Sequence, residues 1–255
     1  MSKYVGRALW PLAGFGIFIA AWYAVALSGT VSDKQLPEPH EVLDTLVAAF
    51  RDDDLVLDWR LSVLRVLIGV AVGCALALHV GFLLAWYGVL RQMFDPLISF
   101  FRALPPIALI PLVIVYLGIG EDARLFILIY AAFFASVVVI YEGIAATDEI
   151  YVRAARSMGA TELEIFRRVV VPLAIPQVLV AVRVALGGCW ATLGAAELIA
   201  AQRGLGATIQ NNANFFKIEM VYGGIILIGL SALVMDRLLA VVMKRAVRWQ
   251  ERVGS

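Results

Sequence analysis

Charged residues are scarce in this sequence: Asp, Glu, Lys and Arg make up only 16% of its 255 residues. Soluble domains are ordinarily about 25% charged, so this chain has too few polar groups to cover a surface that faces water. Hydrophobic residues account for 62%, and the mean hydropathy is +0.88. The composition therefore predicts a membrane protein whose solvent is lipid.

Cysteine and histidine are rare as well, with two of each. Cys74 and Cys189 fall inside apolar runs, which predicts small buried side chains rather than a disulfide or a metal pair. His40 and His79 are too far apart to suggest a metal site, and His79 is interpreted as a buried, hydrogen-bonded residue, with a proton relay as the alternative. A net charge of +1 gives no general attraction to nucleic acid. Metal and nucleic-acid binding are thus not expected.

The sequence also lacks a nucleotide-binding loop. No GxxxxGK[ST] segment occurs, and the glycine-rich stretches GIGEDAR and RGLGATIQ contain no lysine in the required place. No set of nucleophile, base and orienting residue is visible either. We expect no catalytic residues and no bound cofactor, so the chain is not predicted to be an enzyme.

Long hydrophobic runs are what the sequence does contain. Six of them approach or exceed the roughly 20 helical residues needed to cross a bilayer. They cover residues 10–27, 61–86, 100–117, 125–141, 176–201 and 221–243. The first is interpreted as a retained anchor rather than a signal peptide, because it lacks a small-residue cleavage site followed by a soluble domain. We predict an all-α polytopic membrane protein of about six transmembrane helices in one domain, residues 1–255.

The third run is irregular because Pro105, Pro106 and Pro111 lie inside it. Proline removes a backbone donor that lipid cannot replace, so this span should be kinked and packed against protein. A broken or re-entrant segment is the alternative.

Lys and Arg are distributed unevenly between the loops. About twice as many lie on the side of the N-terminus as on the opposite side, which predicts that both termini are cytoplasmic. Residues 142–175 then form a cytoplasmic loop. In the first outer loop, Val42, Leu46 and neighbouring apolar residues recur at helical spacing, which predicts a short helix that packs over the bundle or lies on the outer membrane surface.

The cytoplasmic loop contains two short amphipathic segments. Ile150, Ala154 and Met158 form one apolar stripe, and Gly159 is expected to end that helix in the left-handed conformation. Two amphipathic helices joined by a turn in this way either lie in the lipid headgroup layer or dock a cytoplasmic partner.

The second segment begins with its own start signal. Thr161 and Glu164 have the spacing of a capping box, Leu163 and Phe166 continue the apolar face, and Pro172 is expected to stop the helix.

This loop resembles the cytoplasmic signature of binding-protein-dependent ABC importer permeases, which is Glu-Ala-Ala, three residues, Gly, nine residues, Ile, one residue, Leu-Pro. The spacing is intact here in Arg153, Ala154, Ala155, Gly159, Val169, Val171 and Pro172. Arg153 replaces the glutamate, so a contact made through that glutamate is not carried over. Residues 105–120 and 190–206 are similar to the branch that handles taurine, other sulfonates, nitrate and bicarbonate, and the latter is most similar to its taurine permeases.

The resemblance implies a type I ABC importer permease fold in a bacterial inner membrane. It implies a homodimer of permeases, two cytoplasmic ATP-binding cassette subunits that hold ATP and Mg²⁺, and an external substrate-binding protein. The loop would then dock the ATPase. Its expected contact residues are Arg153, Ala154, Ala155, Met158, Gly159, Ala160, Leu163, Phe166, Val169 and Pro172.

Ionisable groups within spans are costly and require explanation. Glu197 is a candidate to line the pathway, or to pair with Arg203 or cap a packing contact. Arg183 lies about 21 Å from Glu197 along one helix, so these two cannot pair within a chain. Arg183 is expected to attract a sulfonate or to pair with another helix, while Trp190 lines the pathway or packs.

Three further charges are given structural interpretations. Arg65 is expected to snorkel at the outer end of its span, and Asp236 and Arg237 to pack in the bundle or snorkel toward the inner end.

The resemblance favours taurine or a related sulfonate as substrate, with nitrate or another alkylsulfonate open. A secondary transporter driven by an ion gradient is the alternative class, although it would usually need more spans or internal repeats. A membrane-embedded enzyme is disfavoured by the missing reactive cluster.

Overall fold

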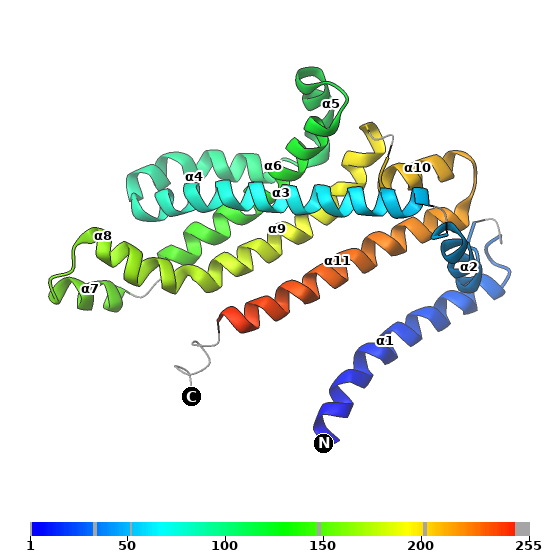
Figure 1. The fold of residues 1–255 in the computed structure, drawn as a ribbon, viewed down its shortest axis with the longest axis horizontal. Coiled ribbons are helices and arrows are strands. Elements are labelled where there is room, and N and C mark those ends of the chain that lie inside the picture. The colour runs from blue at the N-terminus through cyan, green and yellow to red at the C-terminus, as the bar shows by residue number, and fades with distance from the viewer. Residues whose placement is uncertain (1, 33–34, 52, 147–148, 201–202, 248–255) are drawn as a thin grey trace.

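A computed structural model describes residues 2–32, 35–51, 53–146, 149–200 and 203–247, and within these ranges the regular structure is entirely helical. Figure 1 shows the order of the elements along the chain. They are α1 (Ser2–Leu27), α2 (Pro39–Ala49), α3 (Asp53–Trp86), α4 (Gly88–Ala103), α5 (Pro106–Leu117), α6 (Glu121–Ala145), α7 (Glu149–Ser157), α8 (Glu162–Ile165), the π-helix η1 (Phe166–Val170), α9 (Val171–Ala200), α10 (Leu205–Asn214) and α11 (Ile218–Ala246).

Four helical stretches in the described part of the chain are long and apolar enough to cross a membrane. They are α3, α6, α11 and the continuous stretch Glu162–Glu197. The bent pair α4 and α5 would make a fifth, and the described apolar part of α1, Ala13–Leu27, is shorter. The all-α polytopic prediction is confirmed. The predicted end of the fifth span at residue 201 lies outside the described residues.

The third predicted span, residues 100–117, is not one helix. α4 and α5 meet at an angle of 94°, and α5 begins directly after Pro105. Leu104 precedes that proline and has an extended ψ of 121°, the conformation that a following proline imposes. The alternative of a broken or re-entrant segment is therefore the correct one, and the interpretation as one kinked span is wrong.

The centre of the molecule is the contact between α3 and α6. Gly69, Gly73 and Gly81 of α3 face α6 so closely that a Cβ atom at Gly73 would lie 2.5 Å from the Cβ atom of Ala132. Small residues at four-residue spacing let two backbones approach in this way, as is common between membrane helices. Gly187 of α9, by contrast, has open space around it in this chain.

The fifth span begins earlier than predicted because Pro172 does not stop the second loop helix. α8 continues through η1 into α9, and the amide of Val171 donates to the carbonyl of Phe166 in the i to i−5 pattern of a π-helix. Proline is tolerated at the second residue of α9 because the π-helical turn before it shifts the hydrogen-bond pattern. Pro176 also lies inside α9.

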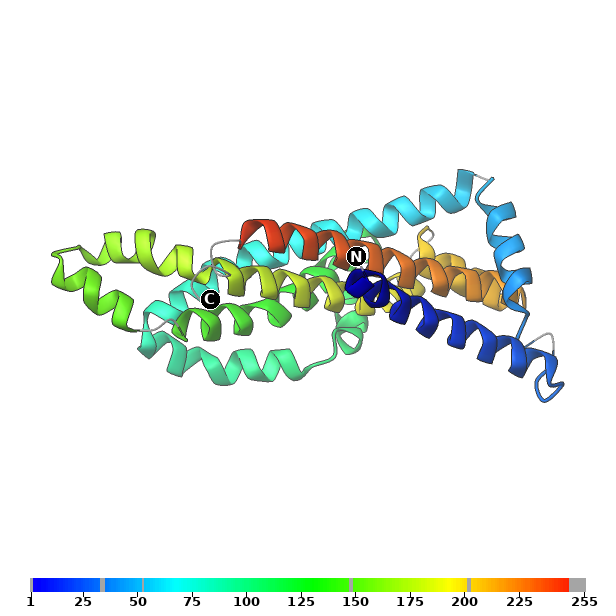
Figure 2. The same cartoon turned by 90° about the horizontal axis from the view of Figure 1, so that it is seen from below.

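The N-terminal helices lie at one end of the molecule. The predicted short helix is confirmed as α2, and its Leu46 packs against Gly223 of α11. α1 is fixed near its C-terminal end, where the Trp22 indole nitrogen donates to the carbonyl of Pro37 at 3.0 Å and its ring lies 5.5 Å from that of Tyr222. The rest of α1 runs away from the bundle in Figure 1, and Figure 2 shows that it turns back along the length of the molecule.

The molecule is elongated, with different structures at its two ends. α3, α9 and α11 run along the long axis, with α7 and α8 beyond one end and α2 and α10 at the other (Figure 1). Residues on the long helices can therefore be located by whether they lie closer to α7 and α8 or closer to α10.

Candidate functional site

Helices α7 and α8 form a projection joined by a tight turn. The φ of Gly159 is 83°, in the left-handed region that glycine adopts without strain. The amide of Ala160 donates to the carbonyl of Ala155 at 3.1 Å, and that of Gly159 to the carbonyl of Arg156 at 3.1 Å. These two bonds form a Schellman motif, so the predicted glycine turn is confirmed.

The start of α8 is fixed by its own side chains. The Thr161 hydroxyl accepts from the Glu164 amide at 3.4 Å, and the Glu164 carboxylate accepts from the Thr161 amide at 3.0 Å, which confirms the capping box. The Arg156 guanidinium then donates to Glu162 Oε1 from Nη2 at 2.8 Å, joining α7 to α8 across the turn. These bonds fix the angle between the two helices.

The outer surface of the projection carries large apolar side chains. Ile150, Met158 and Leu163 are exposed, Met158 by 81%. A groove of about 290 Å³ lies beside Leu163, between α8 and the end of α3. Exposed apolar side chains gathered in this way on a projection are typical of an interaction site.

The inner surface of the projection is anchored to the bundle. Ile165 and Val170 are buried, and the ring of Phe166 makes edge contacts with Phe82 and Trp86 at centroid distances of 5.5 and 5.1 Å. The start of η1, directly after α8, is therefore packed against the end of α3.

The ten predicted contact residues divide between these two surfaces. Those exposed are Arg153, Ala154, Met158, Gly159 and Leu163; Ala155 is buried; those partly buried are Ala160, Phe166, Val169 and Pro172. Arg153, which stands at the glutamate position of the signature, is ion-paired with Glu149 one turn earlier.

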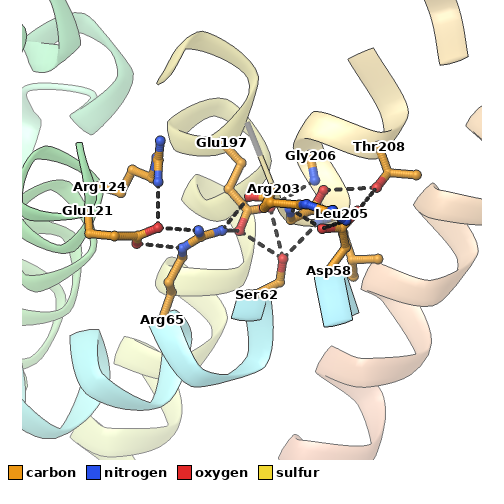
Figure 3. A network of polar contacts seen from close by, with 11 residues as sticks. Asp58, Ser62, Arg65, Glu121, Arg124, Glu197, Arg203, Leu205, Gly206 and Thr208 are labelled. Atoms are coloured by element: carbon orange, nitrogen blue, oxygen red, sulfur yellow. Dashed lines mark hydrogen bonds and ion pairs between the residues drawn. The ribbon is translucent and has the colours of Figure 1, made fainter. Parts of the chain in front are cut away.

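A second polar site lies near the opposite end of the molecule, around the fully buried carboxylate of Glu197 (Figure 3). Glu197 accepts from Arg65 Nη1 at 2.6 Å, from the Ser62 hydroxyl at 2.8 Å and from the Gly206 amide at 2.8 Å. The other edge of the Arg65 guanidinium donates to both oxygens of Glu121, at 2.8 and 2.5 Å. Four helices, α3, α6, α9 and α10, meet at this network.

The turn before α10 fits against the network because it contains glycine. The φ of Gly204 is 127°, and a Cβ atom there would lie 2.5 Å from Arg65 Nη1. A Cβ atom at Gly206 would lie 2.6 Å from that of Glu197. The Gly206 amide is in the first turn of α10, where a carboxylate is favoured by the helix dipole.

The outer rim of the network is held by aspartates of α3. Asp58 accepts from the Gly204 amide at 3.0 Å and from the Thr208 hydroxyl at 2.9 Å. Arg203 donates to Asp54 at 2.5 Å, and this hydrogen bond raises the pKa of Arg203 above its ordinary value. Arg203 and Gly204, which directly precede α10, are thus tied to the start of α3.

Two predicted pathway residues lie inside the protein. Glu197 pairs with Arg65, with no bond to the Arg203 side chain, and Trp190 packs in an apolar cluster with Leu128 and Leu193. From the sequence, Arg203 rather than Arg65 was expected as the possible partner of Glu197, while the packing of Trp190 is one of the two placements left open for it.

The interpretation of Arg65 as a snorkelling residue is wrong. Its side chain is only 4% exposed, because it is held inside the protein by Glu197 of α9, by Glu121 of α6 and by the carbonyl of Arg203, which precedes α10.

Arg183, the third predicted pathway residue, is paired but accessible. Its Nε and Nη2 atoms donate to the two carboxylate oxygens of Asp236 on α11, at 2.6 and 2.7 Å. The side chains are 50% and 32% exposed. Asp236 is thus the helix partner that the sequence left unidentified.

His79 is exposed rather than buried, which corrects its expected placement. Its Nδ1 atom lies 2.7 Å from the carbonyl of Ala75 in the same helix, so the expected hydrogen bond is present. His79 lies on the side of α3 that faces away from α6, so it is not buried between the two helices.

These features define a polytopic membrane protein, and comparison with known proteins identifies its class. Residues 69–248 match the family described as binding-protein-dependent transport system inner membrane component. The chain belongs to this family, the inner-membrane permeases of ABC importers.

Named relatives place the chain in the taurine and sulfonate branch of the family. The taurine transport system permease protein TauC of Escherichia coli K12 is 32% identical over 99% of this chain and 93% of its own length. The putative aliphatic sulfonates transport permease protein SsuC of the same organism is 32% identical over 91% and 88%. A probable ABC transporter permease protein of Brucella abortus strain 2308 is 43% identical over 94% and 95%.

A solved structure supports the same fold. A chain of the MetNI methionine ABC transporter in an inward-facing conformation superposes with a TM-score of 0.60, covering 74% of this chain and 96% of its own, at 23% identity. The type I importer fold expected from the loop signature is confirmed. Since the relatives are permease subunits, the chain is a transport component rather than an enzyme, and ATP hydrolysis belongs to a separate subunit.

Proposed function

We propose that this chain is the permease of an ATP-driven importer for taurine or a related small sulfonate. Two copies form the pathway, two cytoplasmic ATP-binding cassette subunits drive it, and an external binding protein delivers the solute. Membership of the importer permease family supports the ATPase and binding-protein partners over an ion-gradient transporter.

The exposed apolar surface of α7 and α8 is the observation that carries the proposal. Met158 and Leu163 face outward from a turn that is fixed by the Schellman motif and the capping box. A partner that holds these side chains grips a rigid element, so its movement is transmitted through Phe166 to α3 instead of being absorbed by a loose loop.

The substrate class rests on the named relatives. TauC is named for taurine and SsuC for aliphatic sulfonates, and both align with nearly the whole chain. Because an external binding protein sets selectivity in many importers of this type, titrating that protein with taurine, alkylsulfonates and nitrate tests the choice directly.

The docking role is tested with Met158→Asp and Gly159→Asp in the complex with the ATPase. We expect both variants to insert in the membrane and to lose ATPase copurification and sulfonate uptake. Met158→Asp places a charge in the apolar contact. Gly159→Asp adds a side chain where the φ is 83° and where a partner's backbone would approach.

Phe216→Asp is the matched control. Phe216 is an exposed apolar residue with a positive φ of 56° at the opposite end of the molecule, and aspartate tolerates that conformation. It should copurify with the ATPase as the unmodified chain does. Normal ATPase retention by Met158→Asp and Gly159→Asp would contradict docking at α7 and α8.

A further inference from the structure

Arg183 and Asp236 lie in the middle of their helices. Arg183 is about 18 Å from the start of α9 and Asp236 about 15 Å from the end of α11, at 1.5 Å per residue. Both residues belong to helical stretches that are long and apolar enough to cross a membrane, so we expect the ion pair to lie at the depth of the hydrocarbon. The pair joins α9 to α11 at that depth.

This chain leaves the pair uncovered. Charged side chains near the centre of a bilayer cost about 2.5–3.5 kcal/mol each on insertion scales, and they normally face the bundle interior or a water-filled cavity. The Arg183 side chain is nevertheless 50% exposed and that of Asp236 32%. The face that carries the pair is therefore not a lipid-facing surface.

The pair also leaves part of the guanidinium available. Asp236 takes one N–H from Nε and one from Nη2, and Nη1 has no bond to any other residue that the structure describes. Gly187, one turn further along α9, has nothing within 4 Å of the place where a side chain would begin. Open space and unused donors thus lie side by side.

We propose that Arg183 contacts the sulfonate group of the solute as it crosses the membrane, with Asp236 as the counter-ion. This inference rests on the proposed function. The guanidinium fork matches the oxygens of a sulfonate, and Asp236 keeps the site nearly neutral, so that the anion binds weakly enough to leave. An ammonium group on the same solute, as in an aminosulfonate, finds its complement in the Asp236 carboxylate.

The test uses the complete importer in proteoliposomes, with labelled taurine carried by the binding protein. We expect Arg183→Gln and the double variant Arg183→Gln with Asp236→Asn to lose uptake about tenfold or more, the loss of one charged hydrogen bond. Binding-protein-stimulated ATP hydrolysis should persist in both. Arg237→Gln, which removes the adjacent charge outside the pair, is the matched control and should transport normally.

The double variant separates transport from packing. If the pair only holds α9 to α11, removing both charges together restores a neutral interface, and uptake at the unmodified rate would overturn the proposal. Loss of ATP-dependent taurine uptake in the unmodified importer would instead refute the proposed function, so the two failures are distinguishable.

A second measurement remains informative if Arg183→Gln does not assemble. Gly187→Cys should react with a membrane-impermeant sulfonate-bearing thiol reagent faster than with a cationic reagent of similar size, and taurine should slow the reaction during turnover. Lack of reaction at residue 187 would show that this face is closed to water and would overturn the proposal.

Discussion

Single residues in this protein are most constrained where charge is buried. Arg124, Glu121, Arg65 and Glu197 alternate in sign through the network near the α10 end of α9, so each charge has an opposite neighbour. Removing one partner of such a buried pair leaves the other charge uncompensated. This destabilises a protein more than replacing both partners by apolar residues does. Glu197 is the central residue, because it also holds α10 through the Gly206 amide.

Glu197→Gln should destabilise the protein by about 3–5 kcal/mol, the usual cost of breaking a buried ion pair. The amide keeps the shape but removes the fully buried negative charge beside Arg65 Nη1, which leaves Arg65 paired only with the more exposed Glu121. Thermal unfolding of the detergent-solubilised protein should show a markedly lower midpoint. Glu219→Gln is the control, since Glu219 has no ion pair among the described residues; equal midpoints for the two variants would contradict the role of the network.

Local signals at the residue scale were predictable from sequence, and distant pairings were not. The Gly159 turn and the Thr161–Glu164 capping box depend on residues within one or two turns of each other. The Arg65–Glu197 pair joins positions 132 residues apart, on α3 and α9. The polar sequence of α10 gave no sign that it would cover a span.

Among the elements, α3 and α6 set the packing of the bundle. Their contact depends on glycine, because a Cβ atom at Gly73 would lie 2.8 Å from the carbonyl oxygen of Ile129. Backbone cannot move aside as a flexible side chain can, so any larger residue separates the two helices along their length.

Gly73→Ala should therefore destabilise the bundle although alanine favours helix. We expect a loss of roughly 1–3 kcal/mol from overpacking, read as a lower unfolding midpoint and weaker expression. Gly229→Ala in α11 has open space around it and should be neutral or slightly stabilising. A stabilising effect at residue 73 would show that α3 and α6 are less tightly packed than described.

Hydrophobicity predicted that the long helices exist, but it did not predict where the helices break. Apolar length predicted α3, α6 and α11, whereas the prolines gave opposite results at two places. Pro105 precedes a bend of 94°, while Pro172 sits inside a continuous helix because η1 accommodates it. Each proline leaves a carbonyl of the preceding turn without its usual amide donor, and the sequence alone does not reveal whether another amide takes that place.

At the scale of the whole molecule, the two ends are specialised differently. One end presents the rigid apolar projection of α7 and α8, and the other presents α10 and the aspartates of α3 (Figure 1). The excess of Lys and Arg on the α7–α8 side predicts that this end is cytoplasmic.

Single cysteines at the two ends test this orientation. Ser157→Cys in α7 should react with an impermeant thiol reagent only in inside-out vesicles, and Asn214→Cys in α10 only in intact spheroplasts. Cys74 and Cys189 are buried and should stay unlabelled, which the unmodified chain verifies. Labelling of residue 157 from outside would reverse the orientation and remove α7 and α8 from the reach of an ATPase.

The unbroken stretch from Glu162 to Glu197 has a mechanical meaning. It spans about 54 Å at 1.5 Å per residue, from the capping box at one membrane surface to the buried ion network near the other. A stiff rod clamped at its far end pivots rather than slides when its near end is pushed. If an ATPase docks at α7 and α8 as proposed, its stroke would swing the part of the rod that carries Arg183 sideways across the membrane, and one motion would then both open the pathway on one side and close it on the other.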